Sequence, residues 1–521
     1  MNLSILIQDL ELAALSEAES ADRVRICDLT EDSRTAMPGS LFIARSGTKD
    51  DGSKHLDEAI HAGAVAVVTD RRDACLPDGT HANLYHAPNA AQIGAIIAER
   101  FYGQPSQQLR VAGVTGTNGK TTIAHLTQQV LRHAKLKCGL IGTVEIDDGR
   151  ERSSASMTTP PAIELSRTLA TMVEHGCGAC SMEVSSHALD QGRTSAVSID
   201  AAGFTNLTGD HLDYHKTLEE YGRVKATLFS SLRAGAQAVI NIDDPSSGLM
   251  LQACGAGVNI DRCSMSDDSA DWFGTITDRS LDGMQLSIQS PIGTIEQRVP
   301  FFGDYNASNV LISLGLAGSL LARSGMDEQS RRLVLEESLR DLKLPKGRLQ
   351  RAESHADDVR VFVDFAHSDD SIRSSLSALR SVLPDDASLW CVFGCGGDRD
   401  RTKRPRMGQA ACDGSDRVVL TSDNPRSENP SRIVDDVLSG LDASQRAKVE
   451  VQIDRSHAIR FAIEHAQSGD VIVIAGKGHE SEQIMLGASG ELVAHEFDDA
   501  AHARVELQTR RATAQRTEEI A

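Results

Sequence analysis

The chain has 521 residues, 40% of them hydrophobic, which is enough apolar material for about three folded domains and excludes a disordered chain. Its 53 basic and 74 acidic residues leave a net charge of -21, which disfavours a nucleic-acid or anionic-membrane partner. Ten scattered cysteines and the lack of a secretion-signal pattern or an 18-residue apolar run indicate reduced thiols, a cytoplasmic location and no membrane insertion.

The first hundred residues alternate strand-like and helix-like patterns. Residues 64–68, Ala-Val-Ala-Val-Val, favour a buried strand, and residues 89–102 favour a helix with its isoleucines on one face. Residues 103–106, Gly-Gln-Pro-Ser, have the composition of a linker. We therefore expect a first domain over residues 1–104.

A second unit opens with a strand at 109–114 and alternates strands with helices as far as an apolar helix around 311–321. Within it, residues 272–300 show the period-2 pattern of a small β-meander. The sequence Leu-Pro-Lys-Gly at 344–347 marks the next candidate boundary. The second predicted domain covers residues 105–343.

The remaining residues, 344–521, contain four apolar strands at 359–365, 389–394, 418–421 and 471–475. Strands that alternate with helices predict an α/β fold with a mostly parallel, doubly wound, Rossmann-like sheet. Ligands of such sheets bind beyond the carboxyl ends of the strands, where polar residues follow here: Asp364, His367, Arg399, Asp423 and Glu480. The polar end of the chain, from Arg510, is expected to be frayed.

Residues 113–122, Gly-Val-Thr-Gly-Thr-Asn-Gly-Lys-Thr-Thr, lie between a strand and a helical stretch and have the pattern of a phosphate-binding loop. Val114 stands where the strict P-loop pattern has glycine, and the chain lacks the Asn-Lys-x-Asp motif of GTPases. The loop predicts an ATP site in which Lys120 reaches the phosphates and Thr121 binds Mg²⁺. Its predicted contacts are Gly116, Thr117, Asn118, Gly119, Lys120, Thr121 and Thr122.

Two further residues are candidate metal ligands. Glu183 ends an apolar segment at the carboxyl end of a predicted strand, and a carboxylate there suits Mg²⁺. His211 lies in a polar run, 205–215, that follows another apolar stretch. Lys225 lies on a predicted helix, where pattern alone indicates an ordinary surface lysine.

With these motifs in this order, the chain resembles the Mur ligases from end to end. The resemblance implies a UDP-binding first domain, a central ATPase domain and a third domain that delivers an amino acid. It also implies that Lys225, which follows the matching Asp-His-Leu-Asp-Tyr-His segment at 210–215, reacts with CO₂ to form a carbamate that helps to position Mg²⁺.

The resemblance assigns the substrate contacts as well. Ser33 and Thr48, Lys49 and Asp50 match the uridine contacts, although family members often differ at 48–50. The muramoyl-dipeptide contacts are Thr158, Thr159, Ser185, Gln191 and Arg193. Further nucleotide contacts are Asn306, Arg348 and His367; close to the last of these, Asp369 replaces the family's usual proline.

The family's Asp-Asn-Pro-Arg motif, at 423–426, accompanies specificity for meso-diaminopimelate. A strand end followed by Pro425 gives Arg426 a defined position, and its guanidinium can bind the second carboxylate of that amino acid with two hydrogen bonds. The alternative is that Arg426 caps a turn or pairs with Glu428. The full predicted pocket is Arg399, Asp423, Asn424, Pro425, Arg426, Gly476 and Glu480.

The expected function is ATP-dependent ligation of meso-diaminopimelate to a UDP-N-acetylmuramoyl dipeptide through an acyl phosphate, by a monomer with small-molecule substrates. Three alternatives remain open: a sister ligase that adds lysine or another amino acid, a folate polyglutamate ligase, and a P-loop regulator that binds nucleotide without catalysis. Intact Lys120, Glu183, His211 and Lys225 argue against the regulator.

Overall fold

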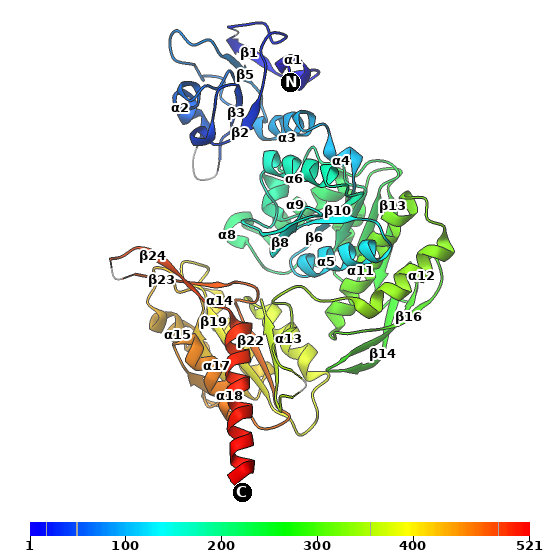
Figure 1. Cartoon of the computed structure of the whole chain (residues 1–521), viewed down its shortest axis with the longest axis vertical. Helices are drawn as coiled ribbons and strands as arrows, with labels where there is room; N and C mark the ends of the chain where they lie inside the picture. The colour runs from blue at the N-terminus through cyan, green and yellow to red at the C-terminus, as the bar shows by residue number, and fades with distance from the viewer. Residues whose placement is uncertain (17, 48–50, 355, 488, 521) are drawn as a thin grey trace. The chain divides into compact units, whose positions relative to one another are not determined.

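The computed structural model describes residues 1–16, 18–47, 51–354, 356–487 and 489–520. The chain divides into two compact units. The first comprises Met1–Leu207, His215–Arg262 and Ile312–Arg331, and the second comprises Thr208–Tyr214, Cys263–Leu311 and Arg332–Ala521. Figure 1 labels their helices and strands.

The first unit begins with a five-stranded sheet in the order β1-β5-β4-β3-β2, drawn in blue in Figure 1. Strands β2 to β5 are parallel and β1 is antiparallel to β5. The predicted helix at 89–102 is confirmed as α3, with Asn89 as its N-cap. The elements are α1 (Leu3–Ile7), β1 (Ala13–Ser16), β2 (Asp28–Thr30), η1 (Ser33–Thr35), β3 (Ser40–Ala44), η2 (Gly52–His55), α2 (Leu56–His61), β4 (Ala66–Thr69), β5 (Asn83–His86) and α3 (Ala90–Phe101).

The candidate linker at 103–106 is only partly correct, because a short helix, α4 (Pro105–Gln108), begins inside it. Pro105 is the first residue of this helix, a position where its missing N–H breaks no hydrogen bond. Proline therefore starts a helix here, whereas the sequence pattern suggested only a chain break.

Most of the first unit surrounds a second sheet, in which β12, β11, β6, β10 and β7 are parallel neighbours and β8 and β9 extend the edge. The predicted strand 109–114 is confirmed as β6, and the predicted helix after the glycine-rich loop as α5. The elements are β6 (Arg110–Thr115), α5 (Lys120–His133), β7 (Cys138–Ile141), β8 (Glu145–Asp147), β9 (Arg152–Ser154), α6 (Ala162–Glu174), β10 (Ala179–Glu183), α7 (Ser186–Asp190), β11 (Ala201–Phe204), α8 (Leu212–His215), α9 (Leu218–Ser230), β12 (Gln237–Asn241) and α10 (Ser247–Ala253). Of these, residues 212–214 of α8 belong to the second unit.

The second unit contains the predicted meander, formed by three antiparallel strands β14, β15 and β16. The end of β13 pairs with the start of β14 in parallel. The elements that follow in the chain are β13 (Asn259–Ser264), β14 (Trp272–Ser280), β15 (Gly283–Gln289), β16 (Ile295–Val299), α11 (Asp304–Arg323), α12 (Glu328–Ser338) and η3 (Leu339–Asp341). Of these, residues 259–262, 312–323 and 328–331 belong to the first unit.

The six-stranded sheet of the second unit has the order β17-β18-β22-β19-β20-β21, and all its strands except β17 are parallel. The four predicted strands are confirmed as β18, β19, β20 and β22. The elements are β17 (Gln350–Arg351), β18 (Arg360–Asp364), α13 (Asp369–Arg380), β19 (Leu389–Cys395), α14 (Lys403–Gly414), β20 (Arg417–Ser422), α15 (Pro430–Leu438), α16 (Ala443–Arg446), β21 (Val449–Val451), α17 (Arg455–His465), β22 (Val471–Ala475), β23 (Glu482–Leu486), β24 (Leu492–Glu496) and α18 (Asp499–Ile520).

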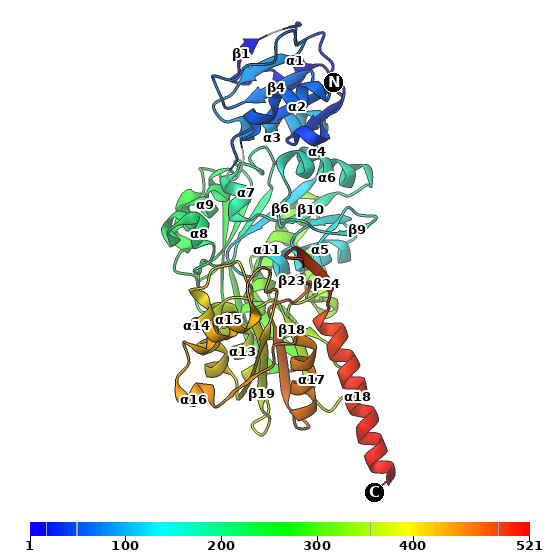
Figure 2. The same ribbon diagram turned by 90° about the vertical axis from the view of Figure 1, so that its left-hand side faces the viewer.

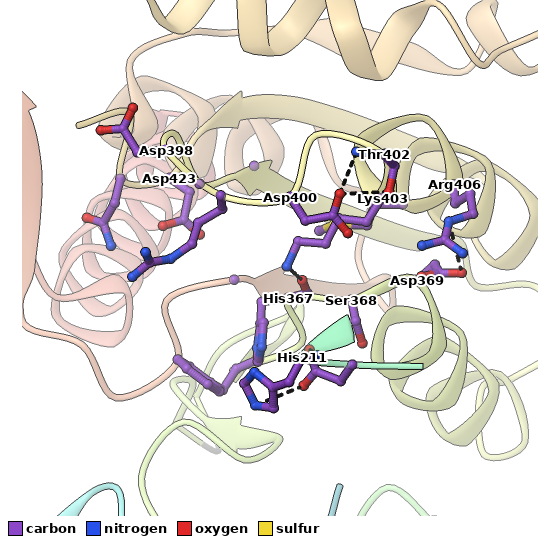
Figure 3. A pocket seen from close by; sticks show the side chains of 18 of the residues that line it. His211, His367, Ser368, Asp369, Asp398, Asp400, Thr402, Lys403, Arg406 and Asp423 are labelled. Atoms are coloured by element: carbon purple, nitrogen blue, oxygen red, sulfur yellow. Dashed lines mark hydrogen bonds and ion pairs between the residues drawn. The ribbon is translucent and has the colours of Figure 1, made fainter. Parts of the chain in front are cut away.

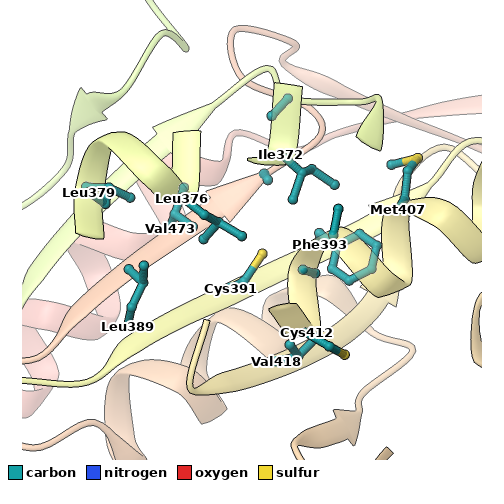
Figure 4. Close-up of a cluster of buried hydrophobic side chains, with 14 of the residues drawn as sticks. Ile372, Leu376, Leu379, Leu389, Cys391, Phe393, Met407, Cys412, Val418 and Val473 are labelled. Carbon is teal, nitrogen blue, oxygen red and sulfur yellow. The ribbon is translucent and has the colours of Figure 1, made fainter. Parts of the chain in front are cut away.

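Helices cover both faces of this sheet, as a doubly wound fold requires. Apolar residues of α13, α14 and α15 pack on one face, where Leu376 and Phe393 belong to the cluster in Figure 4. Residues of α17 and α18 pack on the other face with Val392 and Ile474. Figure 2 shows the two helix layers on either side of the sheet. Alternate residues of each buried strand therefore supply two separate cores.

The expectation of a frayed C-terminus is wrong, because α18 continues to Ile520. Arg510 pairs with Asp358 at 2.8 Å and also donates to the carbonyls of Ile463 and Ala466. These long-range contacts hold the polar helix, and nothing in the local sequence pattern reveals them.

One described helix, α11, is long and apolar enough to cross a membrane by length and composition alone. Of its apolar stretch, 78% is buried inside the protein. That is the pattern of a core helix in a folded domain.

Candidate functional site

The predicted phosphate loop connects the end of β6 to the start of α5. Gly116 has a φ of 145°, and a Cβ at this position would overlap with Thr205 Oγ1, so the loop requires glycine here. The backbone N–H of Thr117 donates to Asn206 O at 2.9 Å, which ties the loop to the segment after β11. Lys120 Nζ donates to the carbonyls of Gly116 and Thr117, at 2.9 and 2.8 Å, so the ammonium lies over the loop.

Glu183 lies at the end of β10, which pairs with β6 in parallel, so its carboxylate is beside the phosphate loop. Its Oε2 accepts a hydrogen bond from Thr121 Oγ1 at 3.0 Å, and its Oε1 accepts one from the Thr143 N–H at 2.7 Å. A Cβ at Gly142 would lie 2.5 Å from Oε1, so a larger residue here would displace the carboxylate from its present position. The predicted pair, Thr121 and Glu183, is thus in direct contact.

These two side chains suit Mg²⁺. Both offer hard oxygen atoms, and Glu183 and Thr121 are only 1% and 3% exposed. In the described part of the chain, no three His, Cys, Asp or Glu side chains form a metal-binding group. A site with one carboxylate fits Mg²⁺, which keeps several waters and takes oxygen atoms from substrate phosphates.

Lys225 is not the surface lysine that pattern alone indicated, because it is only 1% exposed. Its Nζ donates to Gly116 O at 2.7 Å and lies 4.2 Å from the ring centroid of Tyr221. Lys225 and Lys120 therefore share one carbonyl acceptor at the phosphate loop. A carbamate on Lys225 would stand next to this loop.

The predicted dipeptide contacts form one hydrogen-bonded group. Thr159 Oγ1 accepts from the Ser185 N–H at 3.1 Å and donates to Glu183 O at 2.9 Å. Arg193 donates to Thr159 O at 2.7 Å and to Gln191 Oε1 at 2.7 and 3.1 Å. The last member, Thr158, shares a 3.0 Å hydroxyl contact with Thr143. The group thus continues from the candidate metal site, through Glu183, to an arginine that can bind an anion.

The uridine contacts are less well defined by the structure. Ser33 is buried, and its hydroxyl donates to Glu58 at 2.6 Å. The predicted contacts Thr48, Lys49 and Asp50 lie outside the described residues.

In the second unit, a cavity of about 890 Å³ opens beyond the carboxyl ends of the parallel strands. Six of the seven predicted amino-acid contacts line it, and Pro425 does not. His211 and His367 line the same cavity (Figure 3). The predicted contacts brought together here are Arg399, Asp423, Asn424, Arg426, Gly476 and Glu480.

Arg426 is held by the backbone and does not pair with Glu428. Its Nη1 donates to Gly397 O at 2.7 Å, and its own N–H donates to Ile484 O at 3.0 Å. Glu428 pairs instead with Arg401 and Arg404. Of the two alternatives for Arg426, the one in which it caps a turn is therefore partly correct, since one guanidinium nitrogen binds a loop carbonyl.

Two guanidinium groups on this side of the cavity can bind an anion. Burial, and then the neighbouring Arg399 guanidinium, lower the pKa of Arg426 from its ordinary value. An arginine stays charged in spite of such a shift, so two positive groups face one cavity. A carboxylate bound between them would relieve their repulsion.

Asn424, in the Asp-Asn-Pro-Arg turn after β20, is hydrogen-bonded to Glu480, in the loop after β22. Asn424 Nδ2 donates to Glu480 Oε2 at 2.7 Å, and Asn424 Oδ1 accepts from the Ile484 N–H at 2.9 Å. Lys477 is fully buried and donates to both side chains, at 3.2 and 3.3 Å. The Glu480 carboxylate is fixed at the cavity wall, where it can bind an ammonium group.

The predicted nucleotide contacts of the second unit lie on three segments. Asn306 is buried near the start of α11 and donates to Phe302 O at 2.8 Å. Arg348 lies 4.9 Å from the ring centroid of Phe365. His367 follows β18, and burial, then the nearby Lys403, lower the pKa of its imidazole, so it is neutral over a wider pH range.

Asp369, which replaces the family's proline, is the first residue of α13. Ser368 and Ser371 form a capping box at this helix start. An acidic residue in the first turn also interacts favourably with the helix dipole. The local turn is therefore built without proline.

Sequence reasoning missed several residues of these sites: Thr143, Lys403, Lys477 and Arg455. Thr143 lies in a loop and Lys403 is the first residue of α14, and neither segment has a motif of its own. Lys477 lies between the predicted contacts Gly476 and Glu480, so its place in the sequence was an available signal. Arg455 begins α17, far along the chain from the residues that it contacts.

Comparison with known proteins gives three domain matches in order. Residues 26–102 match the Mur ligase family catalytic domain, residues 114–317 the Mur ligase middle domain and residues 347–478 the Mur ligase glutamate ligase domain. A Mur F ligase structure from Thermotoga maritima in complex with ADP has a TM-score of 0.60 at 16% identity, covering 94% of this chain and 99% of its own, which shows a shared fold.

Closer relatives cover the whole chain. A protein of Synechococcus elongatus named UDP-N-acetylmuramoyl-L-alanyl-D-glutamate–2,6-diaminopimelate ligase is 40% identical, over 98% of this chain and 99% of its own length. One of the same name from Geobacillus thermodenitrificans is 40% identical, over 93% and 96%. A solved structure with that name is 33% identical, with a TM-score of 0.69 and coverage of 98% and 99%. The chain belongs to the Mur ligase family.

Proposed function

We propose that this Mur ligase uses ATP to join meso-diaminopimelate to UDP-N-acetylmuramoyl-L-alanyl-D-glutamate in cell-wall precursor synthesis. The observation that carries the proposal is the cavity of the second unit, whose lining includes two arginines, Arg399 and Arg426, and the carboxylate of Glu480. The arginines suit a carboxylate, and Glu480 suits an ammonium group. A diamino acid with a second carboxylate presents both groups to the cavity. Full-length relatives carry this enzyme's name.

The chemistry needs activation, because a carboxylate has no good leaving group. ATP transfers its γ-phosphoryl group to the terminal carboxylate of the dipeptide, and ADP leaves. The amine of diaminopimelate then attacks the acyl phosphate, an amide bond forms, and phosphate leaves with the amine's proton passing to solvent. Lys120 neutralises charge on the phosphoryl group during the transfer.

Bound Mg²⁺ would supply further positive charge at the phosphates. We propose Thr121 and Glu183 as its ligands, together with His211 and a carbamate on Lys225. The burial of Lys225 and its contact with Gly116 support the last assignment. The carbamate forms when the neutral Nζ attacks CO₂, so that an N–C bond forms and one proton is released.

The predicted domain boundaries at 104 and 343 remain part of the proposal. Each lies between two matched segments, since the matches end at 102 and 317 and resume at 114 and 347. We also propose a cytoplasmic location, where UDP-linked substrates and ATP are available.

The test is phosphate release from ATP with the UDP-dipeptide and either meso-diaminopimelate or lysine. Lysine would leave the Arg426 site without its carboxylate, and sites of this kind reject such analogues by up to about 10⁴–10⁵. We expect turnover with diaminopimelate alone. Equal kcat/KM values for the two amino acids would refute the specificity and leave the ligase assignment standing.

Arg426→Ala is the matched variant. Removing one partner of a desolvated charge pair costs about 2–5 kcal/mol, so the KM for diaminopimelate should rise steeply while the KM for ATP stays unchanged. Arg401→Ala is the control, because this exposed arginine pairs with Glu428 and does not line the cavity.

A further inference from the structure

Arg455 and Asp499 form a buried ion pair behind the amino-acid cavity. Both side chains are fully buried, and neither lines the cavity. Arg455 Nε and Nη2 donate to the two carboxylate oxygens of Asp499, each at 2.7 Å. Arg455 is the first residue of α17 and Asp499 the first described helical residue of α18, so the pair joins two helices on the same face of the sheet (Figure 2).

The other guanidinium contacts reach the sheet. Arg455 Nη1 donates to Ser422 O at 3.3 Å, and Nη2 donates to Ala475 O at 3.0 Å. Ser422 and Ala475 are the last residues of β20 and β22. These strands are not neighbours, because β19 lies between them. One side chain therefore connects two strand ends across a third strand.

Each of these strand ends leads directly into the cavity wall. Asp423 follows Ser422 and begins the turn that carries Arg426, and Gly476 follows Ala475 and begins the loop that carries Glu480. Arg426, which suits a carboxylate, and Glu480, which suits an ammonium group, thus lie on two loops. Arg455 binds the starting point of each loop and holds the two points at a fixed separation. A bound amino acid must reach both loops at once, so the separation of the loops affects how well it binds.

We propose that Arg455, oriented by Asp499, is a positioning residue that sets the spacing between the Arg426 turn and the Glu480 loop, and so determines amino-acid affinity. The inference rests on the proposed function for the identity of the amino acid. Binding groups must be held within about 0.5 Å of the productive geometry, and a guanidinium that bonds both strand ends supplies that constraint. Stability alone does not account for the pair, since apolar replacements of buried ion pairs are often neutral or stabilising.

The decisive variant is the double replacement Arg455→Met with Asp499→Leu. It removes both charges together, so no buried charge is left unpaired, and it also removes the two hydrogen bonds to the strand ends. We expect the melting temperature to stay within a few degrees of the wild-type value and the KM for diaminopimelate to rise at least about tenfold, a loss of about 1.4 kcal/mol of binding. The KM values for ATP and the UDP-dipeptide should change less than twofold.

Two milder variants keep the test informative if the double variant does not fold. Arg455→Lys retains the charge and loses the planar fork, and Asp499→Asn retains the side-chain shape. Both should raise the amino-acid KM with little effect on kcat at saturation. A wild-type amino-acid KM in the folded variants, or equal rises in all three KM values, would overturn the proposal and leave Arg455 with a structural role.

Arg510→Lys provides the matched control, because Arg510 anchors the same helix through Asp358 and two carbonyls of other residues, and it contacts neither strand end. It should lower the melting temperature and leave every KM unchanged. The wild-type enzyme is assayed with diaminopimelate and lysine in parallel. If it uses lysine, the proposed specificity fails, and the role of Arg455 is then judged from the KM for lysine.

Discussion

At the scale of single residues, the phosphate loop makes the plainest prediction. Lys120→Ala removes the ammonium that lies over the loop at Gly116 and Thr117, and with it the charge that we propose stabilises the transferring phosphoryl group. We expect turnover to fall at least about 10³-fold, with an unchanged circular dichroism spectrum. Lys135→Ala, an exposed lysine after the same helix, is the control. Near-normal ligation by the Lys120 variant would place the ATP site elsewhere.

Lys225 permits a test that separates a carbamate from an ordinary ammonium. Lys225→Ala should be nearly inactive, and formate or acetate should restore part of the activity by occupying the place of the carbamate. Arg223→Ala is the control, since Arg223 lies on the same helix and pairs with Glu219 at the surface. A fully active Lys225→Ala variant would show that its burial serves packing alone.

At the scale of elements, Glu428 joins the turn after β20 to α14. Its carboxylate accepts two hydrogen bonds from the fully buried Arg404, at 2.8 and 3.1 Å, and Arg404 also donates to Gly396 O after β19. The hydrogen bonds from Arg404 are the main reason that the pKa of Glu428 falls from 4.5 to about 2. The Arg399 and Arg426 segments are thereby joined.

A depressed carboxyl pKa stabilises the folded protein above the unfolded-state pKa, and the contribution is lost as pH falls through the folded value. For Glu428, the stabilisation should be complete above pH 4.5 and gone near pH 2. The difference in unfolding free energy between wild type and Glu428→Gln should therefore shrink from pH 6 to pH 3 in urea titrations. A difference that is constant over this range would contradict the assignment. Glu506→Gln is the control, because Glu506 is buried to a similar extent and, among the described residues, pairs only through Arg460 Nε, at 3.1 Å, with a half-exposed arginine.

The elements that could be predicted from sequence are those with strong local patterns. The four parallel strands of the second unit, the meander and the β6–α5 phosphate loop follow from periodicity and glycine placement. The polar helix α18 could not be predicted, because it is held by Asp358 and by carbonyls of α17. Its own sequence has no apolar stripe that marks a buried face along its full length.

The residues of the candidate sites also divide into those that the sequence predicts and those that it does not. The family motifs identified Arg426, Glu480 and Glu183. Each lies at or shortly after the carboxyl end of a parallel strand, so its place in the sequence indicates at which edge of the sheet it lies. The burial of Lys225 and the Arg455–Asp499 pair depend on contacts between distant segments. A sequence pattern records neighbours along one element, so it gives no access to such contacts.

At the scale of the whole molecule, the net charge of -21 contrasts with the cavity of the second unit. Four cations line it, together with six carboxylates: Arg399, Lys403, Arg406 and Arg426, and Asp210, Asp369, Asp398, Asp400, Asp423 and Glu480. An acidic surface keeps the protein soluble and disfavours nucleic acid, while local cations select small anionic substrates. The cavity therefore offers cations for an anionic group and carboxylates for an ammonium group, inside a protein whose total charge is negative.

The division into two units leads to the last prediction, which concerns unfolding. Proteins of this size with several domains seldom unfold in a single two-state step, so calorimetry should show more than one transition. Leu169→Ala, in the core of the first unit, and Leu376→Ala, in the core of the second, identify the transitions, because each should destabilise only its own unit by about 2–5 kcal/mol.

The proposed dipeptide contacts that the structure describes all lie in the first unit, from Ser33 to Arg193. A ligand that binds only the folded form stabilises it by about 2.7 kcal/mol at a hundred times its Kd. The UDP-dipeptide, added alone, should therefore raise the transition that Leu169→Ala lowers and leave the other unchanged. Arg193→Ala should abolish this shift without moving the second transition. A UDP-dipeptide that raises only the transition of the second unit would show that the dipeptide site has been assigned to the wrong part of the chain.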